Sequence, residues 1–245
     1  MNPIRSVNGT ALSALVLAVG IAAGGWFVGH GFLRGRTASR YVEVKGLAER
    51  QVAADLALWP LRFVTTGDDL SVAQAEITKD TRSVYTFLAR HGIDTAAVQL
   101  LALEVSDAQA NRFPERGGTR FVIQQTVMVR SDKPQVVLAA SQRVSELVSA
   151  GVILSSSGEY GIGGPTFVFT KLNQLKPAMV AEATANARAA AQQFAADSRT
   201  ALGDIRYANQ GIFVILPRDQ APGVNEGGQL QKTVRVVSTV QYLLE

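Results

Sequence analysis

The acidic pair Asp68 and Asp69 is the sequence feature most suggestive of chemistry, because two adjacent carboxylates can bind a metal or share acid/base work. No third ligand lies near them in the sequence. A run with helical periodicity begins directly after them, and an aspartate at that position accepts hydrogen bonds from the first free backbone amides. We therefore interpret one of the two as a helix cap.

Other nucleophiles and metal ligands are scarce. The chain has no cysteine, which excludes disulfides, thiolate zinc sites and cysteine nucleophiles. Its two histidines are His30, in an apolar N-terminal segment, and His91, at the end of a predicted helix. The serines at 155–157 lack the Gly-x-Ser-x-Gly pattern of a nucleophile. The sequence thus predicts no catalytic and no metal-binding residue, and we expect a protein that is not an enzyme.

Further polar patterns also have a structural explanation. The glycine-rich residues 158–165 resemble a phosphate-binding loop, but Pro165 and a predicted strand follow where such a loop needs a helix and a lysine. We therefore expect no bound nucleotide and no other cofactor. The polar loops 111–118 and 217–231 are better candidates for contacts with partners. Acids scattered along predicted strands are interpreted as solvent-facing; they are Glu43, Glu49, Asp55, Glu104 and Asp107.

The net charge of +4 arises from the first 40 residues. They hold four of the 24 basic residues and no acid, so residues 41–245 contain 20 residues of each sign. A neutral domain without a basic stripe offers little attraction to a phosphate backbone. We expect no nucleic-acid partner.

Residues 11–33 carry no Asp, Glu, Lys or Arg. At about 1.5 Å per residue, a helix of this length crosses a hydrocarbon core of about 30 Å. A signal peptide has a shorter apolar region, about 7–15 residues, before a small-residue cleavage site, for which residues 18–20 are a weak candidate. The segment is a spanning helix or a signal peptide, and its length favours an uncleaved anchor.

Periodicity divides the rest of the chain into strands and helices. Strands are predicted at 41–45, 54–65, 98–106, 119–130, 204–216 and 233–243, with an interrupted strand-like stretch at 152–170. Pro60 cannot donate to a ladder and indicates an edge position or a bulge. One helix begins after Asp69 and stops at Gly92, and a second begins at Pro134 and stops at Gly151. A third covers 175–202, with Pro177 in its first turn and Gly203 at its end.

Apolar stripes predict which side of each helix is buried. The first helix should bury Leu70, Ala73, Ile77, Val84, Phe87 and Leu88, and the second Val137, Leu138, Val144, Leu147 and Val148. The third should bury Met179, Ala183, Ala187, Ala190 and Phe194. Because these last side chains are mostly small, the third helix should lie close to a sheet.

Residues 69–130 and 175–243 share one order of elements: helix, strand, long loop, strand. We interpret this as an internal duplication. Hairpins without regular βαβ alternation favour antiparallel pairing. The predicted fold is α+β, with duplicated helix-strand-strand units forming mainly antiparallel sheets, helices packed on them, and a transmembrane helix in front.

Several segments resemble the bacterial SIMPL-domain family over residues 41–244. They are 42–46 (VEVKG), 53–55 (AAD), 91–93 (HGI), 167–173 (FVFTKLN), 175–177 (LKP), 181–184 (AEAT), 186–188 (NAR) and 202–203 (LG). The family includes a periplasmic immunogenic antigen, from which this chain departs in its long apolar N-terminus. The resemblance implies no catalytic residues, a secreted or tethered periplasmic domain, a ring-like or channel-like homo-oligomer, and a link to envelope stress.

The resemblance and the charge pattern disagree on orientation. Charge alone favours a cytoplasmic domain, since Arg34, Arg36 and Arg40 outnumber Arg5 and the α-amine. Following the resemblance, we expect a cytoplasmic N-terminus at 1–10, an inner-membrane anchor at 11–33, a linker at 34–40 and a periplasmic SIMPL-like domain at 41–245.

The expected function is a structural or interaction role in the cell envelope, by a tethered domain that self-assembles. The alternative is a periplasmic domain that binds a small ligand or acts as an enzyme. Self-assembly is expected because the strand 234–244 has only one charged residue, Arg235. Such a strand would pair with a strand of another chain if it lay at a sheet edge. The other reading places this strand at the centre, fully paired within one chain.

We predict that the N-terminal helix stays attached to the mature protein, because its apolar run is longer than a signal peptide requires. The intact mass of the protein purified from membranes should correspond to a chain that begins at or near Met1. A mature N-terminus between residues 19 and 41 would show cleavage and contradict the prediction.

Overall fold

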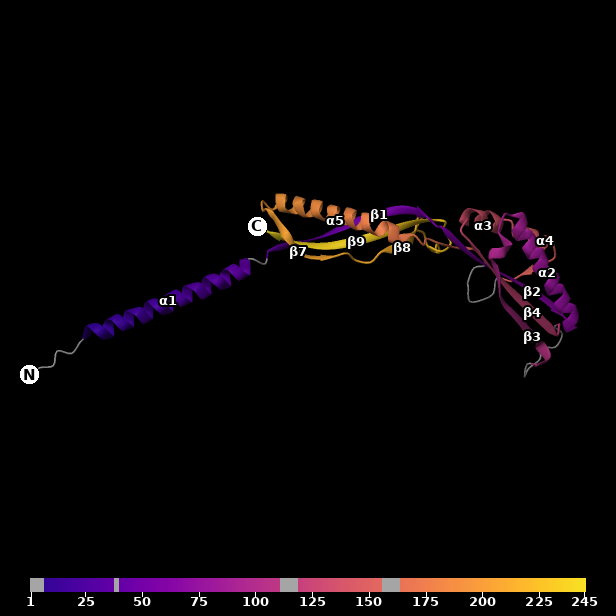
Figure 1. The fold of residues 1–245 in the computed structure, drawn as a ribbon, viewed down its shortest axis with the longest axis horizontal. Coiled ribbons are helices and arrows are strands. Elements are labelled where there is room, and N and C mark those ends of the chain that lie inside the picture. The colour runs from indigo at the N-terminus through magenta and orange to yellow at the C-terminus, as the bar shows by residue number, and fades with distance from the viewer. Residues whose placement is uncertain (1–6, 38–39, 111–118, 156–163) are drawn as a thin grey trace, which may run out of the picture. The chain divides into compact units, whose positions relative to one another are not determined.

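The computed structural model describes residues 7–37, 40–110, 119–155 and 164–245 (Figure 1). The chain divides into two compact units. The first draws on residues 1–47, 180–211 and 237–245, and the second on residues 48–179 and 212–236. Three elements contribute residues to both: β1 (Tyr41–Ala53), α5 (Leu172–Asp197) and β9 (Gln231–Leu244).

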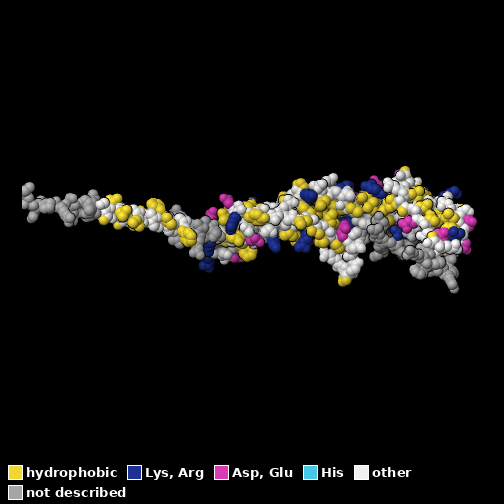
Figure 2. All heavy atoms as spheres, turned by 90° about the horizontal axis from the view of Figure 1, so that it is seen from below, with side chains coloured by type: hydrophobic (Ala, Val, Ile, Leu, Met, Phe, Trp, Pro, Cys, Tyr) yellow, Lys and Arg dark blue, Asp and Glu magenta, His cyan; other side chains and the backbone are white. Residues whose placement is uncertain are grey.

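The first element is a long apolar helix, α1 (Val7–Thr37). Its stretch Ser13–Phe32, 20 residues, is long and apolar enough to cross a membrane, and none of it is buried against the rest of the protein. Figure 2 shows hydrophobic side chains along this helix. An unburied helix of this composition belongs in a lipid environment or in a signal sequence. The structure thus agrees with the predicted spanning helix or signal peptide at 11–33.

The second unit is built on an antiparallel sheet with the strand order β3-β4-β2-β5, in which β6 also pairs with β2. Its strands are β2 (Leu56–Gly67), β3 (Val98–Asp107), β4 (Phe121–Ser131), β5 (Ile153–Leu154) and β6 (Thr166–Val168). The strands predicted at 54–65, 98–106 and 119–130 are confirmed with small shifts at their ends. The interrupted stretch 152–170 contains the two short strands.

Pro60 lies in the middle of β2, opposite Met128 of β4. On its other side β2 pairs with β6 at 56–58 and with β5 at 63–64, and Pro60 falls between the two. The carbonyl of Arg62 accepts from the Ser155 amide on this side, at 2.9 Å. Since backbone groups alternate along a strand, the Pro60 nitrogen faces the same unpaired gap. The predicted edge position or bulge is corrected, because β2 is an inner strand, yet Pro60 removes no bond from the ladder.

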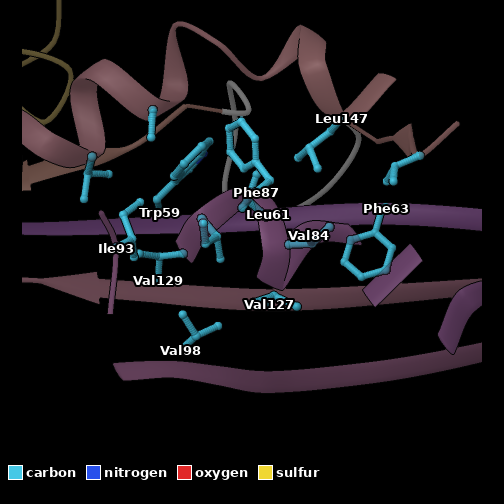
Figure 3. Close-up of a cluster of buried hydrophobic side chains, with 14 of the residues drawn as sticks. Trp59, Leu61, Phe63, Val84, Phe87, Ile93, Val98, Val127, Val129 and Leu147 are labelled. Carbon is cyan, nitrogen blue, oxygen red and sulfur yellow. The ribbon is translucent and has the colours of Figure 1, made fainter. Parts of the chain in front are cut away.

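Helices cover one face of this sheet and close the main core (Figure 3). They are α2 (Leu70–Arg90), α3 (Pro134–Ser141) and α4 (Ser145–Ser149), with the short 3-10 helices η1 (Thr95–Ala97) and η2 (Ala108–Ala110) flanking β3. Trp59, Leu61 and Phe63 of β2 belong to one cluster with Phe87 of α2 and Leu147 of α4. The first predicted helix is confirmed: it ends at Arg90, with His91 as its C-cap, before Gly92, whose φ is 76°. Its stripe is corrected at Leu70, which is exposed because it is the first helical residue.

The second helix is predicted as one continuous helix, and this prediction is wrong. Residues 134–151 form two short helices, α3 and α4, because the amides of Arg143, Glu146 and Leu147 bond carbonyls three residues back and tighten the chain. The turn keeps Val137 and Leu147 in the core. It also rotates Val148 to the surface, where it is 58% exposed, against the prediction.

The other sheet has the order β1-β9-β7, with β8 also paired to β9. The predicted strand 204–216 is two strands, β7 (Leu202–Asn209) and β8 (Val214–Pro217). Gly211, with φ 73°, lies between them, and a Cβ there would come 2.1 Å from the Val237 carbonyl oxygen. A glycine turn therefore breaks the strand. The last strand, β9, is central, which corrects its expected place at an edge.

Within the first unit α5 lies along the sheet (Figure 1). The buried line on α5 recurs every four residues, which is the ridge on which helices commonly pack; it consists of Met179, Ala183, Ala187, Ala191 and Ala195. Phe194, expected inside, falls off this ridge and is 56% exposed, and Ala190 is only partly buried.

The predicted bounds of α5 are also corrected. The helix begins at Leu172, so Pro177 lies in its second turn. It ends at Asp197 because Arg199 adopts a left-handed φ of 54° and the Thr200 amide bonds the Ala195 carbonyl at 3.0 Å. Gly203, expected as the stop, belongs to β7.

The duplication is confirmed and extends to a preceding strand. β2-α2-β3-β4 and β1-α5-β7-β9 have the same order, and in each sheet the first strand neighbours the last, with the middle strand on the far side. β1 also runs antiparallel to β9, because Arg40 meets Leu244 while Glu43 meets Gln241. The architecture is two β-α-β-β repeats, and in the chain the repeat β2-α2-β3-β4 is inserted between β1 and α5 of the other.

Gly46 of β1 allows α5 to lie on its sheet, since a Cβ there would come 1.8 Å from the Ala183 carbonyl oxygen. We predict that Gly46→Ala lowers the free energy of unfolding by about 3 kcal/mol, the upper part of measured overpacking costs, because helix backbone must move. The matched control is Gly164→Ala, whose Cβ meets nothing within 4 Å. Equal urea midpoints for the two variants would contradict the predicted close contact.

Candidate functional site

The acidic pair is separated into two structural roles. The Asp69 carboxylate caps α2, accepting from the amides of Ser71 (2.7 Å) and Val72 (3.1 Å) and from the Ser71 hydroxyl. These bonds, that of the Ser71 hydroxyl first, lower the pKa of Asp69. Asp68 instead accepts from the Arg120 amide at 3.1 Å. The predicted cap is confirmed as Asp69.

His91 has a carboxylate partner that the sequence did not indicate. Its Nε2 lies 3.1 Å from Oε2 of Glu146 on α4, and its ring packs 4.5 Å from that of Phe87, centroid to centroid. Arg90 approaches the same carboxylate at 3.8 Å. The three side chains join the end of α2 to α4.

Most of the scattered acids contact a polar or charged side chain. Glu43 accepts from Gln241, Glu49 faces Arg235, and Asp107 pairs with Arg120 at 3.1 Å. The remaining one, Glu104, lies exposed on β3. In the described ranges no group of three or more His, Asp or Glu side chains is placed to hold a metal ion.

Asp55 joins the turn before β2 to the start of α5. It accepts from the Thr170 amide (2.7 Å) and hydroxyl (2.8 Å), and Lys171 lies 3.7 Å away. Partial burial raises the pKa of Asp55, but the Thr170 hydrogen bonds and Lys171 outweigh it, so the net pKa is lowered. A carboxylate held in this way has a structural explanation.

Of the two loops predicted as contact sites, 111–118 lies outside the described residues. Residues 156–163, which hold most of the glycine-rich stretch and of the serine run, also lie outside them. The loop 217–231 is held at its second half. The buried Lys232 donates to the Glu226 carbonyl at 2.7 Å and pairs with its carboxylate. The Phe167 amide bonds Gly227, and the Ala54 amide bonds Leu230. At the start of the loop, the Asp219 amide donates to the Gln229 side chain, which donates back to the Asp219 carbonyl, so the free part is limited to about 220–224.

The strongest candidate surface is the edge strand β3. Among the described residues β3 has a hydrogen-bonded neighbour only in β4. Leu100, Leu103 and Val105 lie opposite Val127, Gln125 and Ile123, so they point to the helix-covered face. They are nevertheless 58%, 49% and 49% exposed, while their partners on β4 are buried.

The cause of this exposure is the reach of α2, which packs on β2 and β4. β3 lies one strand further out, so beyond Val98, which is buried in the core at the start of the strand, its inner side chains remain exposed. Leu101, 47% exposed, adds a fourth apolar residue at a β-bulge between Leu100 and Ala102. The sequence contained a signal for this surface that the strand prediction did not use. Apolar residues at 100, 101, 103 and 105 are more than the alternation of a strand with one buried face requires.

Asp80 is a buried carboxylate on the sheet-facing side of α2, 4% exposed, between Ile77 and Val84. Burial raises its pKa, the nearby Glu76 raises it further, and Lys79 opposes the shift. The sequence signal was its spacing, three residues after Ile77 and four before Val84, which places it on the apolar stripe.

These features define a class of protein: an α+β domain of two β-α-β-β repeats that follows one apolar helix in the chain. Within it, the chain belongs to the SIMPL family, described as a protein of unknown function (DUF541), which it matches over residues 42–242. The resemblance predicted over 41–244 is confirmed. A search of curated proteins gives no match.

We predict that Asp80→Asn raises the free energy of unfolding at pH 7, on the order of 1 kcal/mol, because it removes a buried charge. A carboxyl whose folded pKa is raised holds its proton more tightly when folded, so its contribution is lost as pH rises through that pKa. The gain should therefore shrink as pH falls toward 4, where the unfolded aspartate also protonates. Urea titrations at both pH values test this, with the exposed Asp132→Asn as control. Equal or lower stability of Asp80→Asn at pH 7 would contradict it.

Proposed function

We propose that this protein is a membrane-tethered, non-catalytic protein of the cell envelope whose domain associates with other copies of itself through the β3 edge. The observation that carries the proposal is the row of exposed apolar side chains on that edge strand. An unpaired strand edge offers amides and carbonyls in the geometry that a strand of another molecule requires. Apolar side chains beside these groups add burial when that strand arrives.

A comparison of the two repeats supports β3 over its counterpart. In the second repeat β7 occupies the equivalent position and exposes Ile205 and Tyr207. It also carries Asp204 and Arg206, and charged side chains protect an edge against pairing. β3 also carries two charged residues, Glu104 and its last residue Asp107, but the Asp107 carboxylate is already paired with Arg120. The first repeat thus has the less protected edge.

The membrane and envelope part of the proposal rests on α1 and on family membership. An unburied apolar stretch of 20 residues supports tethering to the inner membrane through the N-terminal helix. We propose the periplasm for the domain, because the resemblance that the family match bears out implies it, against the arginines that follow α1. A role linked to envelope stress is proposed on the same ground.

Lysines on the edge should abolish self-association, because like charges repel across paired strands and charge disfavours burial. We predict that full-length protein in detergent sediments as an oligomer, and that the double variant Leu101→Lys, Leu103→Lys sediments as a monomer. Both side chains are about half exposed, so the fold should be kept; circular dichroism checks this.

The matched control is Val72→Lys with Val148→Lys, which adds the same charge at residues 65% and 58% exposed on α2 and α4. This control should remain oligomeric. A monomeric wild type at micromolar concentration, or equal assembly of the edge and control variants, would refute the proposal.

A further inference from the structure

A hollow of about 270 Å³ opens between α2 and α4, away from the β3 edge. Its walls combine three kinds of group. Phe87 and Leu147 give it an apolar base, Ser83 and Thr86 supply hydroxyls, and cations and one carboxylate surround it; these charged residues are Lys79, Arg82, Arg90 and Glu146.

The cations of the hollow are unequally neutralised. Lys79 pairs with Glu76 at 2.8 Å, and Arg90 shares Glu146 with His91. For the Arg82 side chain, the described residues supply no ion pair and no hydrogen bond; its carbonyl alone is engaged, by the Thr86 hydroxyl. The guanidinium fork of Arg82 is therefore the group with unused hydrogen-bonding capacity at this hollow.

Two cations of α2 lie side by side at the hollow, and Glu76 offsets only the charge of Lys79. Lys79 and Arg82 stand three residues apart on one helix face, where like charges repel. An anion between them would offset that repulsion, and an arginine fork matches the two oxygens of a carboxylate. The hydroxyl of Ser83, on the next position, can donate to the same oxygens.

We infer that the α2–α4 hollow is a binding site for a small aromatic or apolar carboxylate. The carboxylate lies against Arg82, Lys79 and Ser83, and the apolar body lies over Phe87, Leu147 and Ala150. Repulsion of the ligand's head group by Glu146 is reduced, since the Glu146 carboxylate is already engaged by Arg90 and His91, which lie two helical turns beyond Arg82 on α2. The site is independent of the β3 edge and of self-association.

Benzoate is the probe, with acetate as the head group alone and benzyl alcohol as the body without charge. Saturation-transfer NMR is recorded on the full-length protein in lipid nanodiscs. Benzoate should bind saturably, acetate and benzyl alcohol at least about tenfold more weakly, since loss of a charge-assisted hydrogen bond costs about one decade or more in affinity.

Arg82→Ala should weaken benzoate binding about tenfold, and Arg82→Lys should restore part of it by keeping the charge without the fork. The control is Arg130→Ala, an exposed arginine on β4 that does not line the hollow. Arg82 is exposed, so an unchanged unfolding transition is expected for both of its variants. Absence of saturable benzoate binding, equal binding of benzyl alcohol, or unchanged binding by Arg82→Ala would each overturn the inference.

Discussion

The constraint on which the rest of the second unit depends is the width of a helix relative to a sheet. Neighbouring strands are about 4.8 Å apart and a helix is about 10 Å wide, so one helix covers about two strands. α2 packs on β2 and β4, and the third strand of the repeat, β3, is left beyond it. The core around Trp59, Phe63 and Phe87 is complete without the apolar side chains of β3 beyond Val98. Four of these therefore remain exposed: Leu100, Leu101, Leu103 and Val105.

The other repeat, β1-α5-β7-β9, packs its helix on its sheet in a different way. There the small side chains of α5 and the missing Cβ of Gly46 bring helix and sheet into close contact. Close contact gives tight packing but does not widen the helix, and β7 stays exposed as β3 does. Asp204 and Arg206 protect β7, whereas on β3 Asp107 is paired with Arg120 and Glu104 is the charge that remains. The duplicated fold thus has two equivalent edge strands among the described residues, β3 and β7, and the less protected of the two, β3, is the physical basis for the proposed self-association.

Much of the fold could be predicted from the sequence because it depends on local patterns. The Asp69 cap, the stop at Gly92 and the alternation in β2 need only neighbouring residues, and the duplication follows from element order. What failed depends on distant contacts. The central place of β9 is set by pairing with β1, some 200 residues away, and the end of α5 by a left-handed Arg199 that no propensity indicates.

The candidate surfaces were less predictable than the fold for the same reason. Exposure of Leu100 and Leu103 is a property of which strand α2 covers, and the pairing of His91 with Glu146 joins residues 55 positions apart. The sequence did indicate that chemistry is sparse, since the absence of cysteine and the scarcity of histidine are matters of composition. It could not indicate that Arg82, which no described side chain pairs, borders a hollow, because α4 supplies the other wall.

The central claim, that β3 contacts a second copy of this chain, is tested most directly by site-specific crosslinking. The protein has no cysteine, so Leu103→Cys gives a single position for a benzophenone label, and Val148→Cys gives an exposed position on another surface. On illumination in native membranes, the account predicts a covalent dimer of this chain from position 103 and little from position 148. No dimer from position 103, or equal dimer from both positions, would contradict it.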